Sequence, residues 1–228
     1  MSVEDVIESH PLRLLEGQKA VPKGEISLMM ARHGVGKSAA LINFALDEIM
    51  KERKVLHFSV GMGSEKTHHY YQKIFKDNNQ RYLSSHQKTW EDIYHQFTVV
   101  SYLDVGKMVA DLDDEIETIL GSTDGNPSMI VVDGLDFDAH TEKHLAVLSE
   151  VAKKRGTKVL VSLILHRNGG GEVDLDGPFS VAKGYSSHIY FLEPDPENHR
   201  INLELITEHG NEILPVYFCP HDFIFVPG

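Results

Sequence analysis

The sequence predicts an α/β fold, in which a mostly parallel sheet is flanked by helices and ends in an antiparallel C-terminal extension. Two observations support this prediction. Apolar, strand-length runs alternate with amphipathic, helix-length segments through the first two-thirds of the 228 residues, as in parallel strands joined by right-handed crossovers. From residue 188 onward, short apolar runs follow one another without helices between them, which is typical of antiparallel strands. We expect a single domain over residues 1–228, with residues 1–16 as a helical lead-in.

The first half of the chain contains clear start and stop signals. Ser2 and Asp5 form a capping-box pattern, which predicts a short helix that ends before Pro11. A strand begins near Glu25, and Ala39–Met50 has the apolar stripe of a helix that covers a sheet. The elements predicted next are a continuous apolar strand at Val55–Val60, a helix from Ser64 to about Asp77, a polar loop over 78–87, a short helix around Trp90–His95 and a strand at Phe97–Tyr102.

The second half repeats the alternation and then changes to strands alone. Gly156 is a stop signal for the helix before it, and 194–198 has the composition of a hairpin turn. We expect helices at Met108–Leu120 and Thr141–Arg155, loops over 122–128 and 168–178, and strands at Met129–Asp133, Lys158–Leu165, His188–Leu192, Arg200–Ile206, Ile213–Phe218 and Phe223–Val226.

Composition restricts the location and the partners of the chain. The single cysteine, Cys219, excludes an internal disulfide, no basic-then-apolar leader is visible, and no apolar run approaches membrane-spanning length. We therefore expect a cytoplasmic protein without a membrane span. The formal net charge is −12, and the basic residues are not concentrated in one place. Because nucleic acid attracts proteins through clustered lysine and arginine, we do not expect this chain to bind it.

One segment between the first strand and the following helix has a glycine-bearing turn that ends in Lys37 and Ser38. Such a turn lets the backbone approach phosphate oxygens, and the first N–H groups of the helix have no partner within the helix. Lysine adds a positive charge, and the serine hydroxyl can bind Mg²⁺. The alternative is a plain strand-to-helix turn. The pattern predicts a P-loop that binds ATP and Mg²⁺ through Arg32, His33, Gly34, Val35, Gly36, Lys37, Ser38 and Ala39, with Ala31 where glycine is commoner.

A second carboxylate fits the same site. Asp133 follows four apolar residues, so it lies at the carboxyl end of a buried parallel strand, where ligands of open α/β sheets bind. There it can hold Mg²⁺ through water alongside Ser38. The alternative is that Asp133 only caps the loop that follows it.

Together these segments resemble the RecA-type P-loop ATPase domains, most closely the KaiC and DnaB-type helicase branch. The resemblance covers residues 12–226 and includes the approach to the P-loop, the strand 55–60 with its continuation to Glu65, the strand that ends at Arg167 and the segment 177–192. It implies a RecA-like core, ATP and Mg²⁺ as ligands, and a homo-oligomeric ring. Only the P-loop and Asp133 are specific motifs within it.

Three departures from the family pattern bear on catalysis. Gly61 stands where the resemblance implies a glutamate that activates water, and Ile164 where it implies a glutamine that senses the γ-phosphate. Ile206 and Glu208 stand where it implies cations that reach a neighbouring subunit's nucleotide. A positioned base is worth roughly 10²–10⁴ in rate and an arginine finger roughly 10³–10⁵. The sequence therefore predicts ATP binding with slow or absent hydrolysis, as in a switch or assembly module.

Other functions stay open at this stage. Glu65 and Asp136 are the candidate catalytic carboxylates, and with either of them the chain would be an active RecA- or DnaB-like ATPase motor. A small-molecule kinase is a weaker alternative, because the acidic loop 168–178 makes a poor phosphate lid. The loops after the fourth and fifth strands would face DNA in a ring helicase, and we do not expect translocation on nucleic acid because they carry Asp136, Asp138, Glu172, Asp174 and Asp176.

Overall fold

The computed structural model describes residues 10–15, 17–82, 88–121, 126–165 and 176–228. The helix predicted before Pro11 lies outside these residues. Most of the regular structure follows the prediction. The helical elements are η1 (Pro11–Leu15), η2 (Gly17–Lys19), α2 (Lys37–Met50), α3 (Ser64–Tyr82), α4 (Trp90–Tyr94), α5 (Val105–Gly121), α6 (Thr141–Arg155) and α7 (Asp176–Tyr185).

The strands form one nine-stranded sheet. In chain order they are β1 (Ile26–Arg32), β2 (Val55–Val60), β3 (Phe97–Tyr102), β4 (Met129–Asp136), β5 (Lys158–Leu165), β6 (Ser186–Asp195), β7 (Arg200–Thr207), β8 (Gly210–Phe218) and β9 (Phe225–Pro227). Their order in the sheet is β3-β2-β4-β5-β1-β6-β7-β8-β9, with β1 to β6 parallel and β7 to β9 antiparallel. The predicted parallel sheet and its antiparallel C-terminal extension are therefore confirmed.

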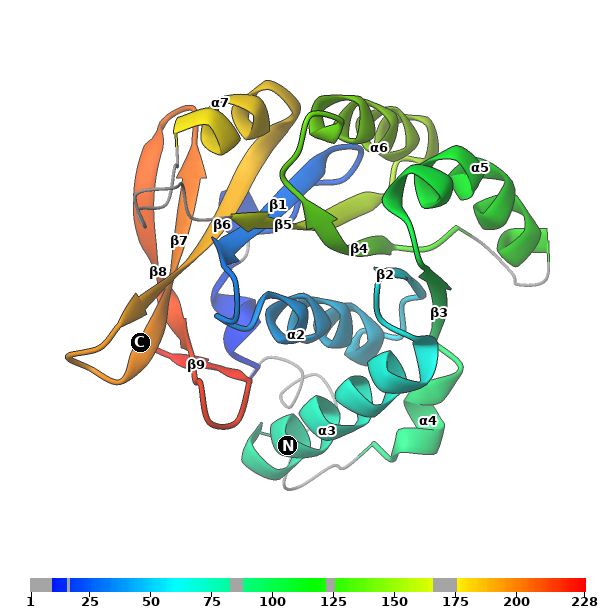
Figure 1. Ribbon diagram of the computed structural model, residues 1–228. Coiled ribbons are helices and arrows are strands. Elements are labelled where there is room, and N and C mark those ends of the chain that lie inside the picture. The colour runs from blue at the N-terminus through cyan, green and yellow to red at the C-terminus, as the bar shows by residue number, and fades with distance from the viewer. Residues whose placement is uncertain (1–9, 16, 83–87, 122–125, 166–175) are drawn as a thin grey trace.

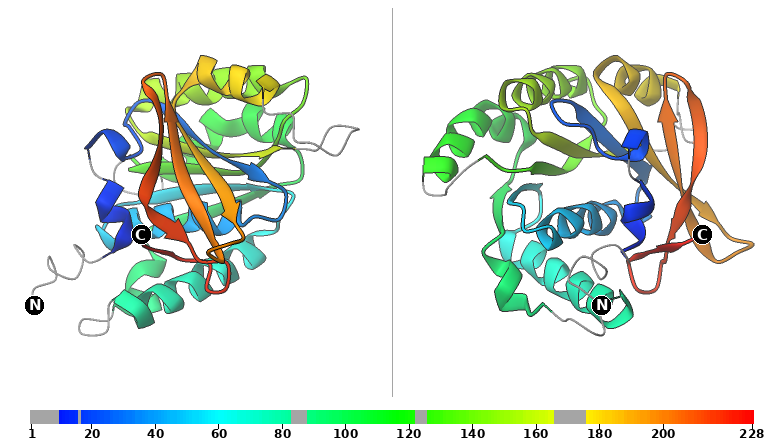
Figure 2. Two further views of the ribbon diagram at one scale, coloured as in Figure 1. Left: turned by 90° about the vertical axis from the view of Figure 1, so that its left-hand side faces the viewer. Right: turned by 180° about the vertical axis from the view of Figure 1, so that it is seen from behind.

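Helices cover both faces of the sheet. Figure 1 shows α2, α3 and α4 on one face and α5, α6 and α7 on the other. The buried side chains accordingly separate into two clusters, one between the sheet and α2 and the other between the sheet and α5 to α7. Figure 2 shows the antiparallel strands at one end of the sheet. Phe218 and Phe225 from these strands belong to the α2 cluster, so the C-terminal extension closes the same side that carries the predicted P-loop.

Two predicted loops were wrong in part. Helix α3 continues to Tyr82 through the segment predicted as a polar loop. Asn78 is buried, and its amide nitrogen donates to the Asn43 side chain of α2 at 3.1 Å and to the Ile74 carbonyl at 3.1 Å. These bonds satisfy the polar side chain, so its low helix propensity is overridden by tertiary contact.

The other wrong segment is 176–178, which begins α7 instead of ending a loop. Gly177 and Pro178 indicated a turn, but proline is tolerated in the first turn of a helix, where its missing N–H would have no partner. Helix α5 begins three residues before the prediction, and β4 runs three residues past Asp133.

Candidate functional site

The predicted P-loop is an open turn between β1 and α2. Gly36 is the N-cap of α2 with φ 107°, a backbone conformation that favours glycine. The first intrahelical bond runs from the Ala40 N–H to the Gly36 carbonyl at 3.0 Å, so the N–H groups of residues 37–39 precede it in the first turn. Helix α2 therefore begins at Lys37, and its positive dipole end lies at this turn.

Lys37 lies across the turn in a buried position. Its Nζ donates to the carbonyls of Ala31 at 3.0 Å and of Arg32 at 3.1 Å, and the residue is only 7% exposed. Burial lowers the pKa of Lys37 to about 8, and the carboxylates of Asp133 and Asp136 offset part of that shift. The arrangement places a desolvated cation within the electrostatic reach of both carboxylates.

A residue far along the chain packs against the same turn. A Cβ added at Gly36 would lie 2.8 Å from Cε1 of Phe218, which is fully buried on β8. Real Cβ contacts are not this short, so only glycine fits between the helix start and the Phe218 ring. The C-terminal extension therefore supports the turn directly, a contact that the motif alone does not predict.

Asp133 is positioned by a bulge in β4. The register between β4 and β5 shifts between Val132 and Leu135, and Gly134 has φ 102°. A Cβ at Gly134 would lie 2.5 Å from the Val60 carbonyl of the adjacent strand, so the bulge needs glycine. The bulge lets the strand continue past the carboxylate, which is why β4 is longer than predicted.

Ser162 on β5 fixes the orientation of this carboxylate. Its Oγ donates to Asp133 Oδ1 at 2.7 Å and accepts from the Gly134 N–H at 2.8 Å. Asp133 and Ser162 are 5% and 0% exposed. One Asp133 oxygen is therefore held by a neutral hydroxyl, not by a cation of the chain. A carboxylate and the Ser38 hydroxyl are the type of oxygen ligands that Mg²⁺ prefers.

Further buried polar residues continue from Asp133 along β2. Ser59 pairs with Asp133 across the sheet, and its hydroxyl accepts from Thr67 at 3.3 Å. His57 Nδ1 lies 2.9 Å from the hydroxyl of Tyr71, and burial lowers the pKa of His57 to about 4. The sequence analysis missed this set. Its signal was a polar residue at every second position of an otherwise apolar strand, which places these side chains on one face.

The two candidate catalytic carboxylates differ in their surroundings. Asp136 is exposed at the end of β4, and its charge raises the pKa of Lys37 against the effect of burial. Glu65 is exposed in the first turn of α3, where the helix dipole favours an acid without any catalytic role. The structure therefore brings Asp136 together with Lys37 and Asp133.

The residues at the three departures do not replace the missing groups. Gly61 is exposed in the turn that ends β2, and Ile164 lies on β5 beside Ala31 and Asp136. Glu208 lies in the turn between β7 and β8, where its carboxylate is 3.5 Å from His209 and 85% exposed.

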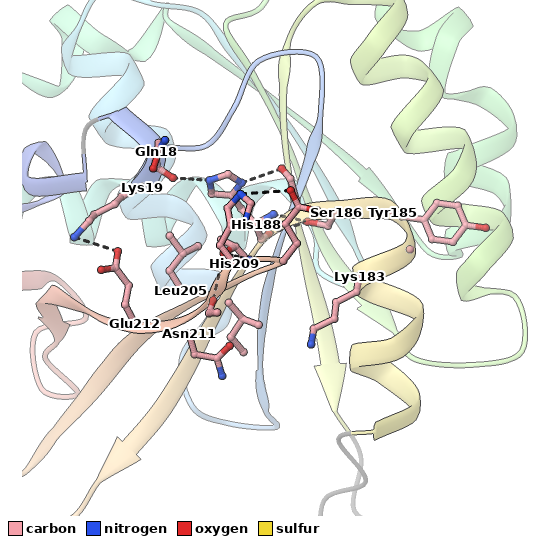
Figure 3. A pocket seen from close by; sticks show the side chains of 16 residues that line it. Gln18, Lys19, Lys183, Tyr185, Ser186, His188, Leu205, His209, Asn211 and Glu212 are labelled. Atoms are coloured by element: carbon pink, nitrogen blue, oxygen red, sulfur yellow. Dashed lines mark hydrogen bonds and ion pairs between the residues drawn. The ribbon is translucent and has the colours of Figure 1, made fainter.

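Glu208 and Ile206 line a cavity of about 840 Å³ (Figure 3). The cavity lies where β1 and β6 begin, at the edge of the sheet opposite the P-loop. Lys19 is paired there with Glu212 at 3.1 Å, and His188 Nε2 lies 2.6 Å from the Gln18 carbonyl. These polar groups of the cavity therefore have partners within the chain.

The remaining predicted P-loop residues are accessible at the turn. Arg32, His33 and Gly34 are exposed, and Val35, Gly36 and Ser38 are half-buried. An Arg32 guanidinium nitrogen lies 3.9 Å from a carboxylate oxygen of Glu193. The tip of the turn is therefore open to solvent, and Ala39 is buried beneath it.

Comparison with known proteins identifies the fold. Within the described residues no helix is both long enough and apolar enough to cross a membrane. No protein-family model matches the sequence, and no curated protein matches it. A solved structure of the ATPase domain of a DnaB-type helicase aligns with 97% of this chain and 91% of that one, at 12% sequence identity and a TM-score of 0.69. The chain therefore has the RecA-like ATPase fold that its sequence predicted.

Proposed function

We propose that this chain is a nucleotide-binding module that holds ATP with Mg²⁺ and hydrolyses it slowly or not at all. The observation that carries the proposal is the P-loop turn, where a buried lysine and the first N–H groups of α2 converge on a turn that is open to solvent. An anion is the ligand that such a turn binds. The RecA-like fold supports a nucleoside triphosphate as the source of that anion.

Mg²⁺ would be held by Ser38 and, through water, by Asp133. The donor set is made of oxygens, and the Asp133 carboxylate is already oriented by Ser162. Bound Mg²⁺ would neutralise charge on the phosphates. The chain's own part is to orient the phosphates through backbone N–H groups and Lys37.

Slow turnover follows from what the chain lacks near the phosphates. Gly61 has no side chain to activate water, Ile164 has no polar group, and Glu208 would repel a phosphate. Affinity and rate depend on different groups in this fold, because the P-loop supplies affinity and the base and cations supply rate. A module with these substitutions would act through its ATP occupancy, as a switch or an assembly unit.

The test is to measure ATP affinity and hydrolysis on the same sample. We expect the wild type to bind Mg²⁺-ATP and to hydrolyse it far below the typical rate of about 1–100 s⁻¹ for phosphoryl-transfer enzymes. Lys37→Ala should lower the affinity by more than about 100-fold, because a buried charge pair is lost. Lys51→Ala, at the other end of the same helix, is the matched control and should bind as the wild type does. Brisk wild-type hydrolysis would refute the switch function.

An active ATPase motor is the second candidate, and one observation favours a particular residue for it. The Asp136 carboxylate acts on Lys37, so it lies nearer than Glu65 to where the phosphates would bind. If hydrolysis is measurable, Asp136→Asn should reduce it more than Glu65→Gln does. Stimulation of hydrolysis by single-stranded DNA would support the motor, although the net charge of −12 argues against DNA binding.

Assembly into a ring is also a proposal, as is the organisation of residues 1–228 as one domain. The support for a ring is the fold. Since Glu208 is an exposed carboxylate, a neighbouring copy would contribute no cation from this position. Light scattering with and without Mg²⁺-ATP would show whether nucleotide changes the oligomeric state.

A further inference from the structure

A second cavity adjoins the tip of the P-loop. Its volume is about 480 Å³, and its wall includes Gly34 and Val35 from the turn. The β6–β7 hairpin forms a second wall with Pro196 and His199, and the β8–β9 connection forms a third with Phe223. Small-molecule sites in proteins are commonly about 300–1,000 Å³. A metal ion or a single phosphate would leave most of this cavity empty.

The third wall is fixed to the P-loop helix. Asn43 of α2 is fully buried, and its amide nitrogen donates at 2.8 Å to the carbonyls of both Ala39 and Phe223. From α3, Arg81 pairs with Asp222 at 3.1 Å, and Lys73 lies 5.3 Å from the centre of the Phe223 ring. The wall and the phosphate-binding turn therefore belong to one braced unit.

The backbone is strained at two positions in these walls. His199 has φ 49° and Phe223 has φ 58°, and they are two of the three non-glycine residues with positive φ in the described part of the chain. Such conformations are unfavourable for a bulky side chain and concentrate at ligand sites. At Phe223 the cost is accompanied by 38% exposure of a large apolar side chain, which leaves its ring accessible beside the cavity.

The charged groups of the cavity are already satisfied within the chain. Asp195 accepts hydrogen bonds from Asn198, from the Arg200 guanidinium at 3.3 Å and from Asn202. The Arg200 guanidinium also lies 5.4 Å from the centre of the Tyr217 ring. What remains at the surface is apolar or aromatic: prolines, two imidazoles and the Phe223 ring. This lining suits a flat, uncharged ring system rather than a second anion.

We propose that this cavity binds the nucleoside of the nucleotide whose phosphates occupy the P-loop, with the Phe223 ring as the face on which the base stacks. The inference rests on the proposed function, because the turn must bind the phosphates for the cavity to receive the base. His221 lines the same wall as Phe223 and is exposed. Its imidazole is a hydrogen-bonding group at the rim of the base site.

The test compares ATP with inorganic tripolyphosphate, which carries the phosphates without the nucleoside. Wild-type protein should bind ATP more tightly than tripolyphosphate. Phe223→Ala should lower ATP affinity by about tenfold, the size expected for loss of one base–aromatic stack, and leave tripolyphosphate affinity unchanged. Phe223→Tyr keeps the ring and should keep ATP affinity. Glu197→Ala, on the same hairpin but outside the cavity wall, is the matched control and should change neither affinity.

The outcomes separate the two proposals. If wild-type protein binds neither ATP nor tripolyphosphate, the proposed function fails. If it binds both equally, or if Phe223→Ala lowers both affinities alike, the nucleoside site is refuted and the P-loop stands. Should Phe223→Ala not fold, His221→Ala decides, because this exposed residue can be removed without loss of core packing. Selective loss of ATP affinity in that variant supports the site, and an unchanged ATP affinity overturns it.

Discussion

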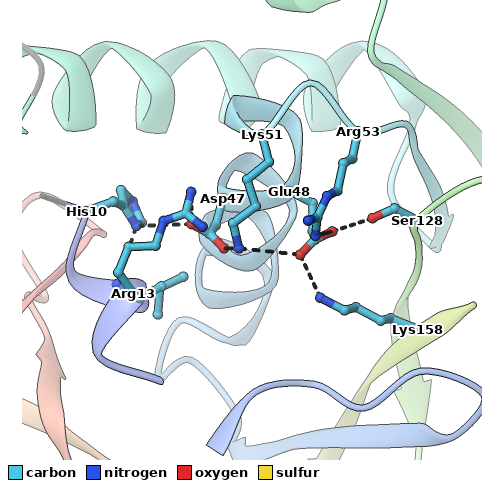
Figure 4. Close-up of polar contacts among 9 residues, drawn as sticks. His10, Arg13, Asp47, Glu48, Lys51, Arg53, Ser128 and Lys158 are labelled. Atoms are coloured by element: carbon cyan, nitrogen blue, oxygen red, sulfur yellow. Dashed lines mark hydrogen bonds and ion pairs between the residues drawn. The ribbon is translucent and has the colours of Figure 1, made fainter. Parts of the chain in front are cut away.

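The two ends of helix α2 handle charge in opposite ways. At the first end, Lys37 and three N–H groups with no helical acceptor surround the P-loop turn. At the last turn, Asp47 and Glu48 are buried among basic side chains (Figure 4). Acids there are unfavourable to the helix dipole, so the surrounding cations have to compensate. The charges at the last turn are balanced by the protein itself, whereas the positive potential at the first turn is left for a ligand.

The balance at the last turn is close and involves distant parts of the chain. Glu48 contacts Lys158 Nζ at 2.7 Å and an Arg53 guanidinium nitrogen at 3.2 Å, and the Ser128 hydroxyl donates to it. Burial alone would raise the pKa of Glu48, but the hydrogen bonds from Lys158 and Ser128 hold it below the ordinary value. The comparison teaches that charge which serves the fold is paired internally, and that unpaired charge indicates a ligand.

The largest effect should come from breaking the balanced end. In Glu48→Gln, Lys158 and Arg53 lose their buried carboxylate, and loss of one partner of a buried ion pair costs about 3–5 kcal/mol. We expect the free energy of unfolding to fall by about 3 kcal/mol in urea denaturation. Asp77→Asn, which removes the accessible i,i+4 pair with Lys73, is the control and should cost less than about 1 kcal/mol. A Glu48→Gln protein as stable as the wild type would show that the pairing is energetically idle.

The next effect is a pH dependence that two groups at the same end hide from each other. Burial lowers the pKa of His10 from 6.5 to about 4, so stability from His10 is present above pH 6.5 and is lost as pH falls through about 4. Burial raises the pKa of Asp47 from 3.8 to about 6, with Arg13 opposing the shift. Stability from Asp47 is present below pH 3.8 and is lost as pH rises through about 6. The two slopes are opposite over the same range.

Removing the histidine should expose the slope of the acid. Relative to wild type, His10→Gln should gain roughly 2–3 kcal/mol of unfolding free energy as pH falls from about 6.5 to about 4, since two pKa units correspond to that energy. Urea unfolding at several pH values measures the difference. A constant offset between the two proteins across this range would contradict the assignment of the low pKa to His10.

The sequence predicted the elements better than the contacts between them. Strands Val55–Val60 and Lys158–Leu165 and helix Thr141–Arg155 are confirmed to the residue, because each is long, periodic and bounded by turn signals. The P-loop turn followed from local chemistry in the same way. The packing of Phe218 on Gly36 could not be predicted, since it joins residues from opposite parts of the chain and depends on how the C-terminal strands fold back.

The candidate site shows the same limit. Asp133 was recognised because a carboxylate after a buried strand is a local pattern. Its partner Ser162 was not, because a serine in a buried strand acquires meaning only when the sheet order places β5 beside β4. The helix 176–185 was missed for a related reason, since Gly177 and Pro178 are ordinary loop residues until they stand in a first turn.

The smallest effect sharpens the comparison at the P-loop end. Ser162→Ala removes the hydroxyl that orients Asp133 and leaves the Gly134 N–H without its partner, so we expect a loss of about 1–2 kcal/mol in stability. Supporting hydrogen bonds around metal ligands are typically worth about 10–100-fold in metal affinity, so Mg²⁺-dependent ATP binding should weaken by about tenfold. ATP binding with Mg²⁺ replaced by a chelator should be unchanged, which separates a positioning role from a merely structural one. Ser27→Ala is the matched control, because Ser27 is equally buried on β1 but its hydroxyl has no hydrogen-bond partner. Equal losses with and without Mg²⁺ would mean that Ser162 supports the sheet and not the carboxylate, and the charge left open at this end would then be read by Lys37 and the helix alone.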